Sequence, residues 1–285
     1  MSHDVIVING CDEKFFPYMD ESLRSLEALH IPDRADMGIL DLGLSDDQVS
    51  SLRARGYIVK KPVWTLALPE TMREQHQIGL VARTALRDYF PGYKVYLWFD
   101  ADAWAQTSEF FDLMVEGARK TGAAVICEDG VGYKMDFIYA KWWYGNMMAA
   151  YGIFDGFKVA QKPVINIGML ALSDTAPHWE AWLNYYLEFV KRRNRVNNQH
   201  SFNAAVVLEN LPCAKLSARC NWIPVLGVPV WNPENRMLCE PGKNGKPVSV
   251  IHLAGPDKKR LYKLDQVGGG CVETSLTWEA IKCLQ

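Results

Sequence analysis

The run KVYLWFDADAW, from Lys94 to Trp104, constrains the fold more than any other part of the chain. Its apolar part, Val95 to Phe99, is typical of a buried strand and ends in two carboxylates one residue apart, Asp100 and Asp102. Residues i and i+2 of a strand lie on the same side, so both carboxylates can face one point at the carboxyl end of this strand. Two like charges there are costly unless a cation balances them. A divalent metal is the simplest balance, since carboxylate oxygens suit Mg²⁺ or Mn²⁺, and a salt bridge is the alternative.

The bulk composition, with 49% hydrophobic and 22% charged residues in a chain of 285, is that of an ordinary soluble globular protein. That length suffices for one large α/β domain or two small ones. The net charge is −2, from 31 basic and 33 acidic side chains, so we expect neither nucleic acid nor an anionic membrane as a partner. We expect no transmembrane segment and no signal peptide. Seven scattered cysteines without a CxxC pair indicate reduced thiols and a cytoplasmic protein.

Short apolar runs alternate with helical patterns along the first half of the chain. We expect strands at Val5–Ile8, Met37–Leu42, Val95–Phe99, Ala123–Cys127, Val164–Leu172 and Ser249–Leu253. We expect helices after Pro17, from Ser45 to Gly56, and over Arg73–Tyr89, Ser108–Gly122, Pro177–Arg192 and Gln199–Leu208. The alternation predicts an α/β fold with a mostly parallel central sheet flanked by helices, in which ligands bind beyond the carboxyl ends of the strands.

Two later segments carry no such alternation. Residues 229–247 are rich in proline, asparagine and glycine, so we expect a surface loop there. Residues 261–285 include Gly268–Gly270, and we expect a loosely attached C-terminal tail. The expected organisation is therefore a single domain over residues 1–260 followed by the tail at 261–285.

Six separated segments carry the polar residues of interest. In chain order they are VIVINGCDEKFF, GLVARTALRDYF, DADAW, INIGMLAL, NNQHSFN and HLAGPDKK. Their order and residue types resemble the nucleotide-sugar-dependent glycosyltransferases of the GT-A fold, most closely glycosyltransferase family eight. That family includes glycogenin-like enzymes and bacterial lipopolysaccharide galactosyl- and glucosyltransferases. The resemblance covers about Val5 to Lys258 and implies a Rossmann-like GT-A fold.

The resemblance assigns the first segment to the nucleoside. It implies that Gly10 and Cys11 offer backbone contacts to the nucleotide. It also implies that Asp12 takes the position of a binding carboxylate and that Phe15 stacks on uracil. The alternative for Phe15 is a core residue beside Pro17.

The DADAW and HLAGPDKK segments are assigned to a metal. The resemblance implies that Asp100 contacts both ribose and metal, with Ala101 beside it at the nucleotide. Asp102 and His252 complete the protein ligands of Mn²⁺ or Mg²⁺. An apolar run precedes His252 and Gly-Pro follows it, which favours a metal ligand over a structural histidine.

Two residues are assigned to the diphosphate, and Arg83 is assigned a catalytic role together with Asn166, Asn198 and Gln199. The resemblance implies that Gly255 lets the backbone approach the diphosphate and that Lys258 contacts a phosphate as a point charge. Arg83 matches an arginine that the family carries one helix before the acidic motif. Its flanking apolar residues favour a fixed anionic or sugar partner, and a surface salt bridge is the alternative.

The INIGMLAL segment is assigned to the transferred sugar. The resemblance places Asn166 and Gly168 near it, and a glycine inside a strand fits the close approach of a ligand or backbone. Ile167 departs from the family pattern, in which serine or alanine is more frequent at this position.

The NNQHSFN segment departs furthest from the family. Asn198, Gln199 and His200 occupy the positions of an acidic-Gln-acidic run beneath the sugar ring, so an amide and an imidazole replace the acids. The alternative is that Asn197 or Asn198 caps a helix. The absence of an acid favours a front-face route over a covalent intermediate.

The reaction that these assignments imply is transfer of a hexose from a nucleotide-diphosphate sugar, a UDP-sugar, to an acceptor hydroxyl with retention of configuration. The acceptor is a carbohydrate, a glycolipid or a protein. The alternatives are a sugar nucleotidyltransferase and a nucleotide-sugar-binding protein on a degenerate glycosyltransferase scaffold. Val131–Phe157 is the expected acceptor-facing surface; of its rings Tyr133, Trp142, Trp143 and Tyr144, we expect at least two to be core.

Overall fold

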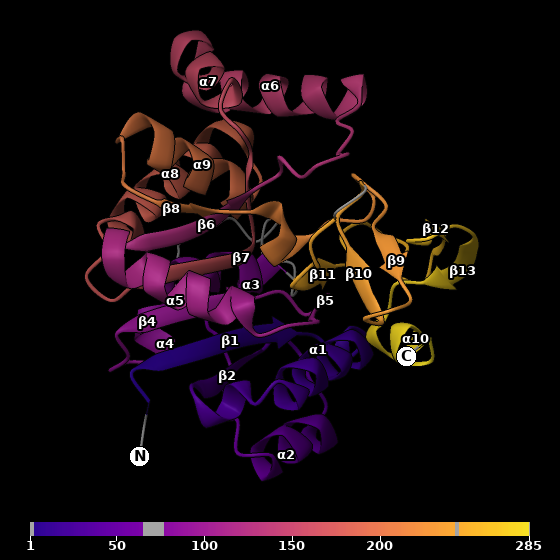
Figure 1. Cartoon of the computed structure of the whole chain (residues 1–285). Helices are drawn as coiled ribbons and strands as arrows, with labels where there is room; N and C mark the ends of the chain where they lie inside the picture. Colours follow the sequence, from indigo (N-terminus) through magenta and orange to yellow (C-terminus); the bar gives the residue numbers. More distant parts are fainter. Residues whose placement is uncertain (1–2, 65–76, 243–244, 285) are drawn as a thin grey trace.

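The computed structural model describes residues 3–64, 77–242 and 245–284, and a seven-stranded mixed sheet lies at its centre (Figure 1). The strand order is β3-β2-β1-β4-β7-β6-β8, and the expected α/β class is confirmed. The strands are β1 (Val5–Cys11), β2 (Asp36–Asp41), β3 (Ile58–Lys60), β4 (Val95–Phe99), β6 (Ala123–Cys127), β7 (Ile165–Ser173) and β8 (Ala214–Leu216).

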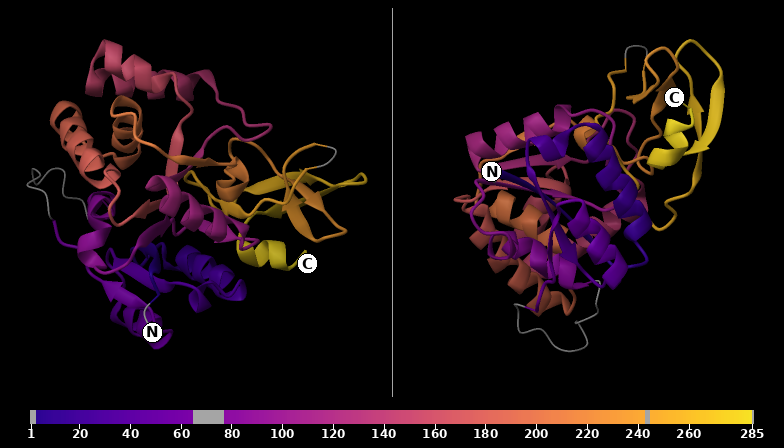
Figure 2. Two further views of the ribbon diagram at one scale, coloured as in Figure 1. Left: turned by 60° about the vertical axis from the view of Figure 1, so that its left-hand side comes forward. Right: turned by 90° about the horizontal axis from the view of Figure 1, so that it is seen from below.

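Helices cover both faces of the sheet, and a further pair forms an outer layer (Figures 1 and 2). On one face pack α1 (Phe16–Ala28), α2 (Asp46–Ala54) and α5 (Glu109–Thr121). On the other pack α3 (Gln77–Ala82), α4 (Leu86–Tyr89), α8 (His178–Arg193) and α9 (Asn198–Leu208). The outer pair is α6 (Phe137–Tyr151) and α7 (Ile153–Ala160), which pack on α8 and α9. Among helices of the described residues, none combines the length and apolar character that a membrane span requires.

The side chains of β4 alternate between the two core layers. Val95, Leu97 and Phe99 pack on the α1–α5 side, whereas Tyr96 and Trp98 pack on the α8–α9 side. Because helices cover both faces, no residue of this strand reaches solvent, which explains its continuous apolar sequence.

One strand reverses the direction of the sheet. Parallel pairing joins β1 to β2 and β4, β2 to β3, and β6 to β8, as the alternation predicts. β7 instead runs antiparallel to β4 and β6. Its first residues therefore lie where β4 ends, and the amide of Asp100 donates to the carbonyl of Gly168 at 2.8 Å. The reversal brings the start of a strand to the edge where parallel strands end.

The predicted helix ends agree with the structure at α2 and at Tyr89, the last residue of α4. Ser45 and Gln48 form a reciprocal capping box, and Gly56 follows α2 with a φ of 85°. The helix expected over Arg73–Tyr89 is present over residues 77–89 and ends at Tyr89 as predicted, but a 3-10 turn divides it in two. Its described part is α3, a 3-10 turn at Arg83–Ala85 and α4, and residues 73–76 lie outside the described residues.

The two segments that were expected to be loose form a second, smaller core. Trp231 and Leu238 come from residues 229–247, Leu264 and Trp278 come from the tail, and all four are buried with Trp104. Both expectations are wrong, because covering these apolar side chains orders the backbone around them. A domain boundary at residue 260 stays a prediction. The elements are β9 (Val230–Asn232), β10 (Met237–Cys239), β12 (Leu261–Asp265), β13 (Cys271–Ser275) and α10 (Trp278–Lys282).

Leu264→Ala should lower the free energy of unfolding by about 2–5 kcal/mol, because a fully buried leucine leaves a cavity when it is truncated. Urea unfolding followed by circular dichroism measures the change. Leu261 lies on the same strand with 63% of its surface exposed, so Leu261→Ala is the matched control. The control should change stability by less than about 0.5 kcal/mol, and equal effects of the two substitutions would contradict the packing of the tail.

Candidate active site

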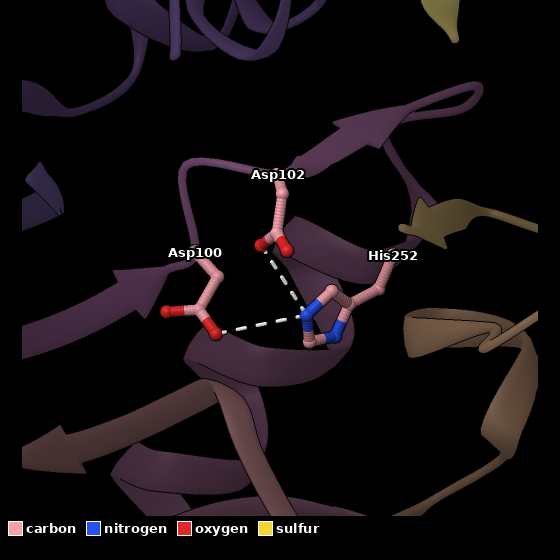
Figure 3. Close-up of side chains that lie close together, drawn as sticks. All are labelled: Asp100, Asp102 and His252. Carbon is pink, nitrogen blue, oxygen red and sulfur yellow. Dashed lines mark ion pairs between the residues drawn. The ribbon is translucent and has the colours of Figure 1, made fainter. Parts of the chain in front are cut away.

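Two carboxylates and an imidazole point toward one another beyond the end of β4 (Figure 3). His252 Nε2 lies 3.7 Å from Asp100 Oδ2 and 3.4 Å from Asp102 Oδ1. The ligand atoms that the three residues offer lie within 4.8 Å of one another. Two carboxylate oxygens and one imidazole nitrogen at this spacing form a donor set that suits Mn²⁺ or Mg²⁺.

Backbone pairing brings the histidine to the carboxylates. After Asp102 the chain enters β5 (Ala103–Ala105), which pairs antiparallel with β11 (Val250–His252) and places His252 opposite Ala103. The amide of Leu253 also donates to the carbonyl of Asp102 at 2.9 Å. The late strand expected at Ser249–Leu253 is thus present, but its partner is β5 and not a strand of the central sheet.

Asp100 uses its two oxygens for different partners. Its Oδ1 accepts hydrogen bonds from Arg83 Nη2 at 2.5 Å and from Trp98 Nε1 at 2.7 Å. The Arg83 guanidinium lies over the Trp98 ring, 4.1 Å from its centroid. Arg83 is thus largely buried against the carboxylate, and the surface salt bridge considered for it is wrong. Oδ2 of Asp100 is left facing His252.

Asp102 divides its oxygens in the same way. Its Oδ2 accepts a hydrogen bond from Lys258 Nζ, which also donates to the carbonyl of Leu253 at 2.6 Å. Its Oδ1 faces His252. Lys258 follows the turn at Gly255, whose φ of 99° lies in the region that favours glycine. Lys258, which was predicted to contact a phosphate, therefore pairs in this structure with Asp102, a candidate metal ligand.

Burial and neighbouring charges act in opposite directions on the pKa values of Asp102 and His252. Burial alone would raise the pKa of Asp102, but His252 and Lys258 outweigh it and hold this pKa below its ordinary value. Burial alone would lower the pKa of His252, but Asp102 and Asp100 outweigh it and raise this pKa. The attraction between the imidazole and the two carboxylates thus favours a proton on His252 and disfavours one on Asp102.

Gly168 leaves space for the cluster. A Cβ at this position would overlap His252 and come within 2.7 Å of Asp100 Oδ2. The glycine inside β7 is thus required by the close approach of two metal-ligand candidates. Asn166, two residues earlier, accepts a hydrogen bond from the Gly168 amide at 2.9 Å and lies behind the cluster.

A cavity of about 220 Å³ opens beside the carboxylates and collects most of the residues predicted for the nucleotide. Phe15 is 37% exposed there, so its interpretation as a core residue is wrong. Leu42 is a lining residue that the sequence did not suggest. The lining residues are Gly10, Cys11, Asp12, Phe15, Leu42, Arg83, Asp100, Ala101 and Asp102.

Backbone and side chains of the first loop have separate roles in the structure. Asp12 Oδ1 accepts from the Phe15 amide at 3.0 Å and holds the turn before α1. The Cys11 thiol points into the core, with Sγ 3.5 Å from Met19 Sδ, and burial raises its pKa. Cys11 can therefore offer only backbone groups to a ligand, as predicted. A Cβ on Gly10 would lie 2.9 Å from the Leu40 carbonyl, so close strand packing explains this glycine.

The start of α9 lies near the start of β7 but does not join the cluster. Asn203 bonds the backbone amide and carbonyl of Ile165 at 2.8 and 2.9 Å. Asn198 is buried, its Nδ2 has no partner among the described residues, and Gln199 is half-buried. No hydrogen bond or ion pair within the described residues links Asn198 or Gln199 to the two aspartates or the histidine. Asn197 is the N-cap, which accepts from the amide of His200 at 3.0 Å.

His200 faces away from the cluster. Its ring lies 4.7 Å from that of Trp143 and 5.3 Å from that of Phe189, measured between centroids. Burial, with Arg195 and Arg193 nearby, lowers the pKa of His200 to about 3. The position beneath the sugar that was expected for His200 is therefore wrong, and this histidine belongs to the layer under α6.

The aromatic rings of the expected acceptor surface differ in their exposure to solvent. Trp143 is 2% exposed and belongs to the core. Tyr133 is half-buried: its ring lies 4.8 Å from that of Trp222, and its hydroxyl accepts from the Ile223 amide. Trp142 is 41% exposed on α6.

Two buried residues behind His252 were missed by sequence reasoning. Asn221 Oδ1 lies 3.1 Å from His252 Nδ1, and Glu128 Oε1 accepts from Asn166 Nδ2 at 2.8 Å. The available signal was a polar residue inside an apolar stretch, since Asn221 lies between Cys220 and Trp222.

Comparison with known proteins identifies the fold. No family model and no curated protein matches the sequence of the chain. Its structure is similar to that of the galactosyltransferase LgtC in complex with donor and acceptor sugar analogues, with a TM-score of 0.55 and 17% identity over 88% of this chain and 87% of that one. It is also similar to apo mouse xyloside xylosyltransferase 1, with a TM-score of 0.54 and 11% identity over 88% of this chain and 97% of that one. The chain therefore has the expected GT-A glycosyltransferase fold.

Gly168→Ala should weaken Mn²⁺ binding by about tenfold or more, because the added Cβ displaces both His252 and Asp100. Isothermal titration calorimetry with MnCl₂ measures the affinity. Among the described residues, a Cβ added to Gly145 on α6 would meet no atom within 4 Å apart from the adjoining backbone of its own helix, so Gly145→Ala is the control and should bind Mn²⁺ as the wild type does. Wild-type affinity in Gly168→Ala would contradict the close approach.

Mn²⁺ affinity should fall as pH drops through the raised pKa of His252, because a proton and the metal compete for Nε2. Below that pKa the loss should approach about tenfold per pH unit, and above it the affinity should level off. Because the pKa of Asp102 is lowered, protonation of this carboxylate does not add to the loss of Mn²⁺ affinity over the same pH range. Electron paramagnetic resonance of free Mn²⁺ across a pH series measures the profile. His30→Gln, at an exposed histidine paired with Asp33, should not alter it, and a flat wild-type profile would contradict the assignment.

Proposed function

We propose that the protein is a metal-dependent glycosyltransferase that moves a hexose from a UDP-sugar to an acceptor hydroxyl. The observation that carries this proposal is the convergence of Asp100, Asp102 and His252 beside a cavity lined by Phe15 and Arg83. The GT-A fold supports it, because its structural neighbours include a galactosyltransferase and a xylosyltransferase.

The residues that line the cavity suit the successive parts of a nucleotide-sugar: the base, the ribose and the phosphates. Phe15 offers an exposed ring for uracil, and its centroid lies 5.6 Å from Lys258 Nζ. Asp12, Asp100 and Ala101 line the same cavity, and in this proposal they contact ribose and phosphate. Mn²⁺ or Mg²⁺ held by the two aspartates and His252 would neutralise charge on the departing diphosphate.

Lys258 has a role that depends on its partner. Its ammonium group balances Asp102 in the structure. When a cation is bound at Asp102, Lys258 can turn to a phosphate oxygen and stabilise the leaving group as a point charge. Arg83 stays with Asp100 and orients it, since this guanidinium is held by both the carboxylate and the Trp98 ring.

The surroundings of α9 favour retention by a front-face route. Asn198 and Gln199 supply amides where a carboxylate nucleophile would otherwise stand. Glu128, a buried carboxylate nearby, already accepts hydrogen bonds from Asn166 and Tyr139. We propose that Asn198, Gln199 and Asn166 orient the sugar and that the departing diphosphate accepts the proton of the acceptor hydroxyl.

The proposed acceptor is a carbohydrate, a glycolipid or a protein that reaches the site along α6. Phe137, Ile138 and Trp142 expose apolar surface on this helix. Rings and aliphatic groups of this kind suit the apolar faces of sugars or of a lipid carrier.

With Mn²⁺ and a panel of UDP-sugars, the wild-type protein should release UDP, and Asp102→Ala should reduce the rate by about 100-fold or more, because it removes one metal ligand and the partner of Lys258. A coupled UDP assay measures the rate. Asp174→Ala is the control, since Asp174 pairs with the exposed Lys94 and should not affect turnover. Release of pyrophosphate would indicate a nucleotidyltransferase, and binding without turnover would indicate a binding protein; either result would contradict the proposal.

A further inference from the structure

A chain of hydrogen bonds runs from the back of His252 into the protein. His252 Nδ1 lies 3.1 Å from Asn221 Oδ1, and Asn221 Nδ2 donates to Asn166 Oδ1 at 2.9 Å. Asn166 Nδ2 donates in turn to Glu128 Oε1 at 2.8 Å. All four side chains are buried, and three of them come from different elements: β11, β7 and the 3-10 turn at Ala218–Asn221. We call Glu128, Asn166 and Asn221 the relay.

The direction of each hydrogen bond in the relay follows from its inner end. A carboxylate of Glu128 can only accept, so Asn166 must turn its NH₂ group toward it. The Asn166 carbonyl oxygen then faces the opposite way, where it also accepts from the Gly168 amide at 2.9 Å. That backbone N–H can only donate, so two independent partners give Asn166 the same orientation.

The same reasoning extends to the imidazole. With the Asn166 oxygen facing it, Asn221 must present its NH₂ group to Asn166 and its carbonyl oxygen to His252. A carbonyl oxygen accepts, so Nδ1 of His252 must carry the proton. The lone pair of the neutral ring is then on Nε2, the nitrogen that faces Asp100 and Asp102.

We propose that Glu128 and Asn221 are positioning residues that hold His252 in the Nδ1–H tautomer, so that Nε2 is available as a metal ligand. This inference rests on the metal site of the proposed function. A histidine ligand needs one defined tautomer and ring orientation, and partners on its other nitrogen usually provide them. Tyr139 supports the inner end of the relay, because its hydroxyl donates to Glu128 Oε2 at 2.7 Å.

The relay also explains why polar side chains are buried here. An unpaired buried amide costs free energy. In the relay, each side-chain NH₂ group of Asn166 and Asn221 has an acceptor, and each side-chain carbonyl oxygen faces a donor. The relay has one direction from Glu128 to His252, and that direction decides which imidazole nitrogen faces the two aspartates.

The test measures Mn²⁺ affinity and the tautomer separately. Asn221→Leu removes the acceptor for Nδ1 and should weaken Mn²⁺ binding by about 10- to 100-fold. Glu128→Gln removes the acceptor-only group without a change in volume and should give a smaller loss, between the wild type and Asn221→Leu. In metal-free protein at alkaline pH, long-range ¹H–¹⁵N spectra should show His252 protonated at Nδ1 in the wild type and as a tautomer mixture in Asn221→Leu.

Glu209→Gln is the matched control, because Glu209 also accepts from a tyrosine hydroxyl, that of Tyr185 at 2.9 Å, outside the relay. It should leave both readouts unchanged. Wild-type Mn²⁺ affinity and a single Nδ1–H tautomer in Asn221→Leu and Glu128→Gln would overturn the relay alone. If Asn221→Leu does not fold, the isosteric Glu128→Gln decides. A wild-type protein that binds no Mn²⁺ would overturn the proposed function, while the His252 spectra would still test the relay.

Discussion

The antiparallel pairing of β5 with β11 is the contact on which the candidate site depends. Asp100 and Asp102 repel each other at the end of β4, and neither could remain buried without cationic or hydrogen-bonding partners. The pairing supplies these partners from the far end of the chain, because it places His252 opposite Ala103 and leads directly to Lys258. The metal-ligand candidates are therefore assembled by backbone hydrogen bonds that involve none of their own side chains.

The reversed strand β7 gives the site its second side. A parallel strand would bring only its final residues to the edge where β4 ends, but β7 brings its first ones, with Asn166 and Gly168 among them. Gly168 then lets the imidazole and the carboxylate approach, and Asn166 connects the histidine side of the cluster to Glu128. β7 thus contributes Gly168, which leaves room for the candidate metal ligands, and the Asn166 side chain, which forms hydrogen bonds behind them.

Much of the fold and part of the site followed from local patterns. The β4 strand, the capping box at Ser45 and the spacing of Asp100 and Asp102 each depend on neighbours a few residues away. Residues 229–247 and the tail were misjudged, because their composition suggests turns while isolated residues such as Trp231 and Leu264 bury into a shared core. Asn221 carries no spacing signal, since its partners are distant in sequence.

The sequence by itself determined the α/β class, the acidic end of β4 and the set of residues from which a metal and diphosphate site could be built. Periodicity and residue chemistry are local properties, so one strand and its two carboxylates suffice to read them. Only the tertiary structure decided that His200 turns into the aromatic layer while His252 turns to the aspartates. Both are buried histidines, and what distinguishes them is which charges and hydrogen-bond partners the fold places around each ring.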